Sequence, residues 1–381
     1  MTQYRIPFNV PTFLGQELAY VSDCLASGRI SGDGEYSKRC QAFLEERHGI
    51  PKALLTTSCT HALEMAALLL DIKPGDEVIV PSFTFVSSVN AFVLRGAKPV
   101  FADIRPDTLN LDERQLHGLI NEKTRAIVLV HYAGVACEMD AIMDIARERN
   151  IAVVEDNAHG LFARYKGRCL GAFGELATLS FHETKNFTCG EGGALLITDP
   201  GLIERAEIIR EKGTNRSRFF RGQVDKYTWV DLGSSYLPSD MLAAFLLAQF
   251  EQAAAIQSRR EEIWRRYQLG LSAWAVSNNV ALPEVPAHVD QAFHMYYMLL
   301  PSMKARAALI QHLKRRGILS VFHYQPLHLS TMGQRYGGRP GDCPVTEDLA
   351  DRLLRLPFYY ALSPDDQDDV IAALHAFEEW Q

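Results

Sequence analysis

What this sequence lacks excludes several classes of protein. No apolar run reaches the roughly 18 residues that a membrane-spanning helix needs. Basic residues are not in excess, since 39 Lys and Arg stand against 46 Asp and Glu. Binding to nucleic acid or to a membrane surface is therefore not expected. The first residues show no basic stretch followed by an apolar one, so we expect no secretory signal.

Cysteine is sparse and irregularly spaced. The seven cysteines include no C-x-x-C pair, which disfavours a disulfide framework or a zinc ribbon and favours reduced thiols. His131, His159 and His182 lack the spacing of a helical zinc site. We therefore expect a cytoplasmic protein without a bound metal.

The length and composition allow a large folded core. With 381 residues, 47% of them hydrophobic and 22% charged, the chain has room for about two globular domains. In the first 200 residues, short apolar runs alternate with stretches of helical periodicity. This predicts an α/β fold with a large, mainly parallel, seven-stranded sheet covered on both faces, one or more strands being antiparallel. The predicted strands are residues 53–55, 77–80, 99–102, 126–130, 151–154, 177–181 and 194–198.

The pattern changes after about residue 240. Residues 240–270 are predicted to form one long helix with an apolar stripe. A smaller α+β part follows, with strands expected at 292–300 and 319–323 and helices at 304–316 and 365–380. We place the boundary near residue 250, so that 1–250 form the large α/β domain and 251–381 the small C-terminal α+β domain.

In an open α/β sheet, ligands bind beyond the carboxyl ends of the strands, and four such ends carry unusual residues. The first strand runs into Ser58, Cys59 and Thr60 and then into a helix, which indicates either a simple helix cap or a phosphate cradle. Phe83 and Phe85 follow the second strand. They are either core aromatics or a plate for a planar ring.

The other two strand ends carry charged side chains. The run at 151–154 leads into Glu155 and Asp156, which are loop acids, metal ligands or partners of a protonated ring nitrogen. Lys185 follows the run at 177–181 and precedes a glycine-rich bend. It is either a solvated charge or, where burial lowers its pKa, an amine that attacks a carbonyl.

Each of these signals is weak alone, but together they are the parts that hold pyridoxal 5′-phosphate (PLP). The helix start would hold the phosphate, and an aromatic side chain would lie on the pyridine ring. Asp156 would keep the ring nitrogen protonated, and Lys185 would form the covalent link to the aldehyde carbon.

Motifs along essentially the whole chain support this interpretation. They lie at residues 27–34, 57–60, 81–85, 154–156, 180–186, 323–328 and 355–357. In this order they resemble the DegT-type nucleotide-sugar aminotransferases. The resemblance implies the aspartate-aminotransferase fold (PLP fold type I), PLP as cofactor, and a homodimer with its active sites at the subunit interface.

The resemblance also implies residue roles. Lys185 would carry the cofactor, Asp156 would contact its pyridine nitrogen, Phe85 would stack on its ring, and His159 would lie near its 3′-oxygen. The other cofactor-binding residues would be Ser58, Cys59, Thr60, Ser180 and Asn186, with Ser235 reaching a phosphate in the other subunit. Many family members carry Asn where this chain has Ser235, and a serine hydroxyl reaches less far.

Substrate contacts are expected in three places. Arg29 lies in the N-terminal glycine motif, and Lys212 lies in a run of basic residues between 205 and 221. That run is either a solvated face paired with neighbouring acids or a positive rim for a sugar-nucleotide pyrophosphate. His323, Tyr324 and His328 would contact the sugar, although each histidine could equally be structural.

Within the family, the runs at 64–71, 131–140, 208–217 and 222–229 are similar to those of enzymes that make dTDP-4-amino-4,6-dideoxygalactose. This implies L-glutamate as amino donor and dTDP-4-dehydro-6-deoxy-D-glucose as acceptor, for a surface polysaccharide such as lipopolysaccharide or enterobacterial common antigen. The alternatives are an aminotransferase for another nucleotide 4-keto-6-deoxysugar, a sugar 3-dehydratase, which Lys185 disfavours, and a non-catalytic PLP-binding protein. A Rossmann oxidoreductase is disfavoured because no G-x-G-x-x-G follows the first strand.

Overall fold

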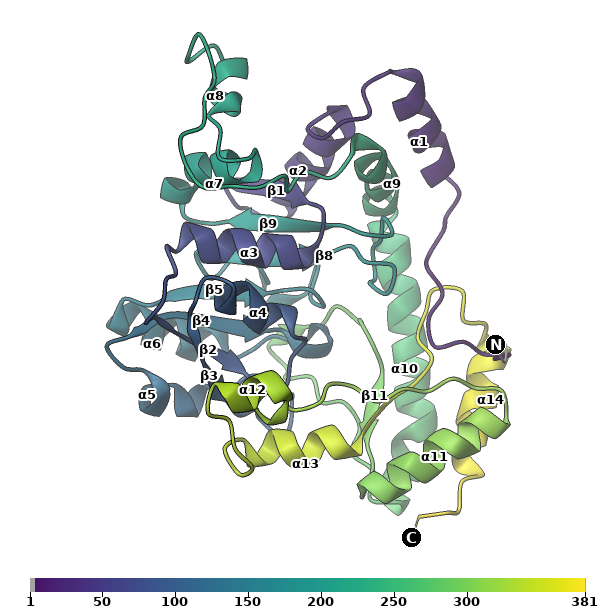
Figure 1. The fold of residues 1–381 in the computed structure, drawn as a ribbon. Coiled ribbons are helices and arrows are strands. Elements are labelled where there is room, and N and C mark those ends of the chain that lie inside the picture. The colour runs from purple at the N-terminus through teal and green to yellow at the C-terminus, as the bar shows by residue number, and fades with distance from the viewer. Residues whose placement is uncertain (1–3, 381) are drawn as a thin grey trace.

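The computed structural model describes residues 4–380, and a seven-stranded sheet forms its centre (Figure 1). The strand order is β1-β9-β8-β5-β4-β2-β3. Strand β9 runs antiparallel to both of its neighbours, and the remaining pairs are parallel. All seven predicted strands are therefore present. They are β1 (Lys52–Thr56), β2 (Glu77–Pro81), β3 (Lys98–Ala102), β4 (Thr124–Val130), β5 (Ala152–Asp156), β8 (Leu176–Ser180) and β9 (Gly193–Ile197).

Helices cover both faces of the sheet, because successive side chains of a buried strand point to opposite faces. Leu54 and Leu195 pack in one cluster, whereas their neighbours Leu55 and Ala194 pack in another. The first face carries α3 (Cys59–Leu69), α4 (Ser87–Val93) and α7 (Ile203–Arg210). The second face carries α2 (Glu35–His48), α6 (Met139–Arg149) and α9 (Asp240–Glu251).

The helix predicted at 240–270 is two helices, which corrects the sequence-based expectation. It consists of α9 and of α10 (Ala253–Ser277), separated at Gln252, whose φ of −102° and ψ of 15° leave the helical region. Helix α10 then passes from one core to the next. Ala253 and Ile256 pack with the sheet, while Ile263 and the following turns pack with the C-terminal part.

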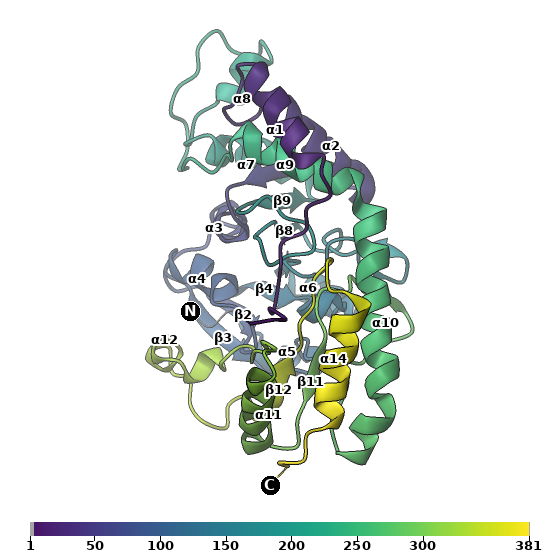
Figure 2. The same ribbon diagram turned by 90° about the vertical axis from the view of Figure 1, so that its right-hand side faces the viewer.

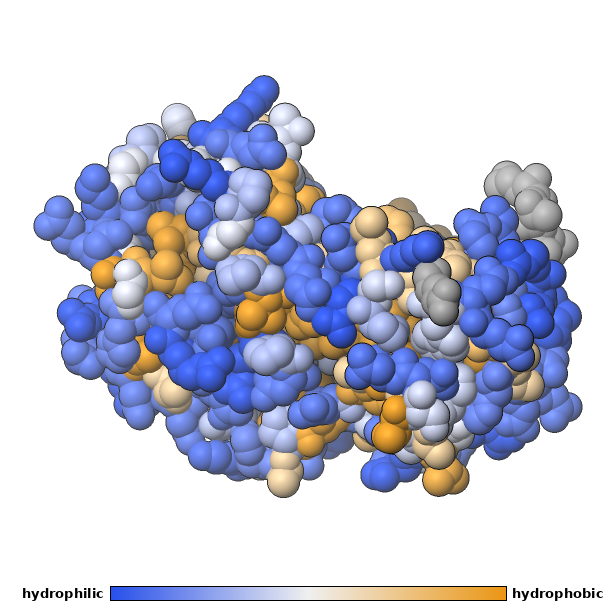
Figure 3. Space-filling model, turned by 90° about the horizontal axis from the view of Figure 1, so that it is seen from below, coloured by the Kyte–Doolittle hydropathy of each residue, from blue (hydrophilic) through white to orange (hydrophobic). Residues whose placement is uncertain are grey.

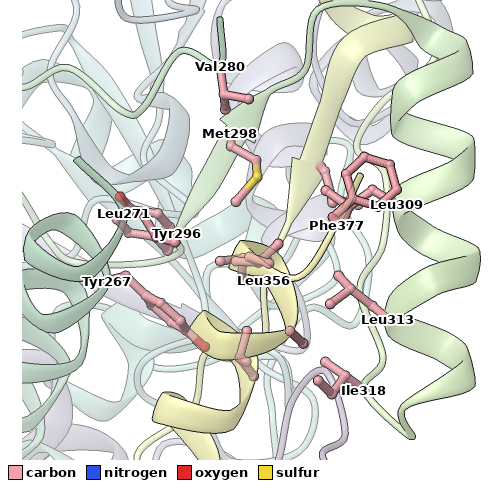
Figure 4. Packing of buried hydrophobic residues seen from close by; sticks show 14 of the residues in the cluster. Tyr267, Leu271, Val280, Tyr296, Met298, Leu309, Leu313, Ile318, Leu356 and Phe377 are labelled. Carbon is pink, nitrogen blue, oxygen red and sulfur yellow. The ribbon is translucent and has the colours of Figure 1, made fainter. Parts of the chain in front are cut away.

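The C-terminal part has its own core (Figure 4). Its elements are α10, β11 (Tyr297–Leu299), α11 (Met303–Arg315), β12 (Leu353–Arg355) and α14 (Pro364–His375), and α14 lies along α10 (Figure 2). Tyr267, Tyr296 and Leu309 are fully buried there. Ile6 joins this core from the N-terminal segment, which was assigned to the large domain. The boundary near residue 250 stays a proposal.

Two predicted strands of this part differ in the structure. Only Tyr297–Leu299 of the run at 292–300 is a strand, paired antiparallel with β12. The run at 319–323 forms no strand, and its Val321 makes a single bridge to Arg355.

The remaining elements lie around these layers. They are α1 (Glu17–Ala26), α5 (Leu116–Leu119), α8 (Arg216–Phe220), α12 (Thr331–Arg335), α13 (Pro344–Arg352) and the short strands β6 (Arg164–Tyr165), β7 (Arg168–Cys169) and β10 (Val289–Asp290). Helix α8 projects from the body of the molecule (Figure 1). Among residues 4–380, no helix combines the length and hydropathy that crossing a bilayer requires. The face seen from below is mostly hydrophilic, with small hydrophobic patches (Figure 3).

We expect Gly193→Ala to destabilise the fold where β9 touches the first turn of α3. A Cβ at Gly193 would lie 2.4 Å from the Cys59 nitrogen and 2.4 Å from the Ser58 carbonyl carbon, so backbone must move. Overpacking of this kind costs about 1–3 kcal/mol, measurable as a lower free energy of unfolding in urea. Gly118→Ala is the matched control, because a Cβ there meets nothing within 4 Å. Equal stability of the two variants would contradict the packing.

Candidate active site

The pairing of β5 with β8 brings the two predicted catalytic residues to one edge of the sheet. The strands are parallel, with Asp156 opposite Thr178, so both end at the carboxyl edge. Lys185 lies in the loop that follows β8. Asp156 shares a face with Val154, which packs toward α3 and α4. The site therefore lies on the face of the sheet that these two helices cover.

Asp156 is a buried carboxylate held by hydrogen bonds. The Ser88 hydroxyl donates to its Oδ2 at 2.6 Å, and the Ala158 N–H donates to its Oδ1 at 3.2 Å. Burial raises the pKa of Asp156, while these hydrogen bonds and the charge of Lys185 oppose the rise. Ser88 escaped the sequence analysis because it lies in the first turn of α4, just after the segment noted for its aromatics. This environment favours a cationic partner for the carboxylate.

Glu155 points to the opposite face of the sheet and has a different role. It accepts hydrogen bonds from His131 Nε2 at 2.9 Å and from the backbone N–H groups of Gly171, Phe173 and Gly174 at 2.7–2.8 Å. These donors saturate the carboxylate inside the protein. Of the two adjacent acids, only Asp156 is directed to the candidate site.

Burial lowers the pKa of Lys185 to about 8. The negative charge of Asp156 opposes this shift, and the positive charge of Arg355 adds to it. At pH 7, roughly one amine in ten is then neutral, compared with about one in 2500 for an ordinary lysine. The amine is therefore prepared to attack a carbonyl carbon.

The start of α3 forms a cradle of hydrogen-bond donors. Ser58 caps the helix, its Oγ accepting from the His61 N–H at 3.1 Å. The N–H groups of Cys59 and Thr60 have no acceptor within the described chain. The Thr60 hydroxyl lies 2.8 Å from the hydroxyl of Ser87.

Side chains of β8 complete this cradle. Cys59 Sγ lies 3.4 Å from Thr178 Oγ1, and Ser180 ends the same strand on the same face. Two of the hydroxyls, those of Ser87 and Thr178, were not predicted. A helix start with free N–H groups and several hydroxyls suits a phosphate.

A second group of side chains, from loops and from the C-terminal part, faces the site. The His159 ring stacks on the His294 ring at 4.3 Å between centroids, and the His323 ring stacks on the Tyr324 ring at 3.6 Å. The Tyr132 hydroxyl lies 2.8 Å from His323 Nδ1. Burial holds the pKa of His159, His294 and His323 well below the usual value. These imidazoles are therefore neutral at physiological pH.

Asn186 and His294 lock part of this group in place. The Asn186 side-chain amide donates to the Ala292 carbonyl at 2.8 Å, and its Oδ1 lies 2.9 Å from His294 Nδ1. This contact leaves the proton on Nδ1 of His294. Sequence analysis missed His294, although a histidine inside the apolar run at 292–300 was a usable signal. The His159 Nδ1 atom is buried and has no hydrogen-bond partner.

The Phe85 side chain is about half exposed to solvent. Its ring centroid lies 6.4 Å from the ring centroid of Tyr324. Phe83, in contrast, is buried against Tyr132. Each of the two alternatives for this motif, a core aromatic or a plate for a planar ring, therefore applies to one of its two aromatics. Phe83 is a core residue, and Phe85 is available to lie on a planar ring.

Four predicted site residues are not brought to this group within one chain. His328 is fully buried, and its ring nitrogens contact Ser82 and Glu347 at 2.6 and 3.0 Å, as in a structural histidine. Arg29 is exposed just beyond α1. Lys212 and Ser235 are exposed on the segments flanking α8, and both lie next to Glu211.

The basic residues between 205 and 221 are paired with acids. Each of the six has a carboxylate within 4 Å. The pairs are Arg205 with Asp71 and Asp231, Arg210 with Asp33, Lys212 and Arg216 with Glu211, Arg218 with Glu204, and Arg221 with Glu207. Apart from Arg210, which is buried, this pattern favours the alternative of a solvated face paired with acids.

The polar groups of the site fit PLP. The α3 start offers donors to a phosphate, the Asp156 carboxylate offers an acceptor to a protonated ring nitrogen, and Lys185 offers an amine to an aldehyde. The orphaned His159 Nδ1 offers a contact for a ring oxygen. The donors of α3, the Asp156 carboxylate, the Lys185 amine and the free His159 Nδ1 thus correspond to four parts of one cofactor.

Comparisons with known proteins agree with this chemistry. The model of the DegT/DnrJ/EryC1/StrS aminotransferase family matches residues 13–375. The chain is 33% identical over 376 residues to GDP-perosamine synthase from Escherichia coli O157:H7, covering 98% of both chains. It is 33% identical over 380 residues to the spore coat polysaccharide biosynthesis protein SpsC from Bacillus subtilis, covering 97% of this chain and 96% of SpsC.

A solved structure shows the same fold. The PLP form of Spr1654 from Streptococcus pneumoniae, assigned as a sugar aminotransferase, superposes with a TM-score of 0.90 at 29% identity and covers 98% of both chains. The predictions of family, fold, enzyme class and cofactor are thereby confirmed. The chain belongs to the DegT/DnrJ/EryC1/StrS aminotransferase family and is a PLP-dependent sugar aminotransferase of fold type I.

Proposed function

We propose that this enzyme transfers the amino group of L-glutamate to the C4 ketone of dTDP-4-dehydro-6-deoxy-D-glucose. The product is dTDP-4-amino-4,6-dideoxy-D-galactose, for surface polysaccharide biosynthesis. The observation that carries the amino transfer is the desolvated Lys185 amine beside the buried Asp156 carboxylate. The choice of sugar and nucleotide rests on the sequence runs at 64–71, 131–140, 208–217 and 222–229.

We assign the cofactor contacts from the unmet groups of the site. The N–H groups of Cys59 and Thr60, at the start of α3, and the hydroxyl of Ser180 would hold the phosphate. Asp156 would accept a hydrogen bond from the protonated ring nitrogen, and Phe85 would cover a ring face. When bound, PLP supplies an aldehyde that takes up the amino group and a ring that stabilises negative charge at the reacting carbon.

The protein's own groups then move and hold protons. Lys185 Nζ is neutral often enough near pH 7 to accept a proton from the donor carbon and to return one to the sugar C4. Ser88 keeps Asp156 Oδ2 oriented. The neutral His159 and His323 line the site without competing for the proton that Lys185 carries.

A homodimer is part of the proposal, with the active site at the subunit interface. Large apolar side chains are exposed on the segments that a second copy would cover, among them Leu18 on α1, Leu94 after α4, Phe220 on α8 and Trp229 beyond it. Ser235 is then directed to a phosphate in the partner, as the family resemblance implies. We place the enzyme in the cytoplasm, because its seven cysteines are all free thiols.

One observation supports a second acceptor. GDP-perosamine synthase is as similar to this chain as SpsC is, and its name carries a GDP-linked sugar. Another nucleotide 4-keto-6-deoxysugar, GDP-linked ones included, is therefore the alternative. The aminotransferase chemistry is the same for both acceptors.

Replacing Lys185 by Ala should lower turnover at least about a thousandfold, because both proton transfers lose their base. In the wild type, borohydride should fix the cofactor to the peptide that contains Lys185, as peptide mass spectrometry shows. Lys166→Ala is the control, since that lysine is an exposed partner of Asp140. Fixation on any other lysine, or normal turnover of Lys185→Ala, would refute the assignment.

Replacing Asp156 by Asn should lower the pKa of Lys185 further below 8, by about one unit. The Asp156 charge favours the ammonium form, so its removal favours the neutral amine. The pH dependence of trinitrobenzenesulfonate labelling of Lys185 in the cofactor-free protein measures this. Asp140→Asn, on the surface, should leave the profile unchanged. A higher pKa in Asp156→Asn would contradict the proposed proximity.

Substrate choice is tested with L-glutamate and a panel of dTDP-, UDP- and GDP-linked 4-keto-6-deoxysugars. We expect the dTDP-glucose-derived ketone to give the highest kcat/KM. Proton couplings at C4 of the product should show an axial amine, the galacto configuration. An equatorial amine, or a preference for the GDP-linked ketone, would replace the proposed product with the alternative.

A further inference from the structure

Arg260 is a buried arginine that the proposed reaction does not use. It lies in α10, and only 2% of its surface is exposed. Among residues 4–380, no carboxylate lies within 4 Å of its guanidinium, whereas Arg265 and Arg266 on the same helix are both paired with acids. Burial lowers the pKa of Arg260 to about 9, so the guanidinium still carries its charge at pH 7. A buried charge of this kind is stable only where other groups of the protein replace the water that would solvate it.

Two backbone carbonyl groups replace that water. The Nε–H of Arg260 donates to the Phe293 carbonyl at 3.0 Å, and its Nη2 donates to the His294 carbonyl at 2.6 Å. The guanidinium carbon also lies 4.7 Å from the centroid of the Phe358 ring. The planar fork of an arginine reaches two consecutive carbonyl groups at once, which the single nitrogen of a lysine does not. Arg260 therefore fixes the backbone at residues 293–294.

The backbone that Arg260 holds is strained. Phe293 has a φ of +49°, in the left-handed region that a bulky side chain seldom occupies. Such a conformation persists only where its surroundings over-determine it. The N–H of Ala292 donates to the Gly134 carbonyl at 3.0 Å, and the Phe293 ring packs against Trp264. The turn at 292–294 is thus held by contacts on both sides, two of which come from Arg260.

This turn directs the His294 ring at the active site. Its Nδ1 lies 2.9 Å from Oδ1 of Asn186, the residue next to Lys185. The same ring stacks on the His159 ring, with 4.3 Å between centroids and 16° between planes. Burial lowers the pKa of both imidazoles, and the charge of Lys185 contributes to each shift. The amine therefore lies within electrostatic reach of the two rings.

Helix α10 also contacts Asn186 directly. Gln257, three residues before Arg260, accepts a hydrogen bond from Asn186 Nδ2 at 3.3 Å, and the Ala292 carbonyl accepts another at 2.8 Å. The Asn186 amide is therefore held by α10 and by the turn at 292–294. Because Lys185 immediately precedes Asn186, the direction of its amine depends on these contacts.

We propose that Arg260 is a positioning residue for the amino transfer. It holds the turn that keeps the His294 ring against Asn186 and His159. Its effect reaches Lys185 through that ring, so that the amine keeps one direction during turnover. The inference rests on the proposed function in one respect, the assignment of Lys185 as the reacting amine.

The test compares the PLP-loaded variants Arg260→Gln and Arg260→Lys with the wild type. We expect Arg260→Gln to lower kcat about tenfold or more, because a misplaced reacting group costs at least that much. KM for L-glutamate should change less than about twofold, since Arg260 binds no substrate. Arg260→Lys should recover part of kcat, because it keeps the charge and one of the two hydrogen bonds. Arg265→Gln is the control on the same helix and should match the wild type, since Arg265 is an exposed partner of Glu261.

A double-mutant cycle separates this role from a general loss of stability. His294→Phe keeps an aromatic ring beside His159 and removes the hydrogen bond to Asn186. In the His294→Phe enzyme, Arg260→Gln should then change kcat less than about twofold. The same cycle is run with Arg260→Lys, which keeps the buried charge.

A second measurement uses the cofactor-free protein. The pH midpoint of trinitrobenzenesulfonate labelling of Lys185 should rise in Arg260→Gln, because an amine that is less firmly held is better solvated. The midpoint in Arg265→Gln should equal that of the wild type.

Wild-type kcat in Arg260→Gln, or an unchanged labelling midpoint, would overturn the proposal. An equal loss of kcat with and without the His294 imidazole would also overturn it, because Arg260 would then act only through the stability of the C-terminal part. Fixation of the cofactor by borohydride on a lysine other than Lys185 would instead refute the proposed function. The cycle between Arg260 and His294 does not depend on that assignment, so the two failures are distinguishable.

Discussion

The pairing of β5 with β8 is the constraint on which the site depends. It places Asp156 at the same edge as the loop that carries Lys185, although 28 residues separate them in the chain. Strand β9 then returns antiparallel, and its Gly193 lies against the first turn of α3. The acid, the amine and the phosphate cradle are thus positioned by three adjacent strands. Burial, rather than any single contact, lowers the pKa of Lys185 and raises the pKa of Asp156. A cation beside Asp156 would therefore stabilise its charged form.

Much of this arrangement was predictable because each strand is an apolar run that ends where polar side chains begin. Apolar runs of about five residues identified all seven strands, and the polar residues that follow them identified Ser58, Asp156 and Lys185. A parallel sheet brings such ends to one edge, so chemistry could be inferred from adjacency without coordinates. The antiparallel member could not be chosen, since β9 is as apolar as its neighbours.

The remaining features depend on tertiary contacts that leave no local signal. Neither proline nor glycine marks the break between α9 and α10 at Gln252. His323 and His328 lie in the same sequence motif. The His328 ring contacts Ser82, whereas the His323 ring contacts Tyr132 at the site. No periodicity in that loop distinguishes them. His294 lies in a run predicted as a strand, and Arg355 lies in a family motif. Only the fold shows which way their side chains point.

The position of Ile6 has a consequence for how the molecule is made. Its backbone bonds to Gly317 and Leu319, and its side chain packs in the core formed by residues 263–377. The ribosome therefore releases this segment long before its partners exist. The side chain of Ile6 therefore lacks its packing partners until residues 263–377 have been synthesised. Contacts this distant in sequence slow folding, so the core that contains Ile6 cannot be completed before the C-terminal part has been made.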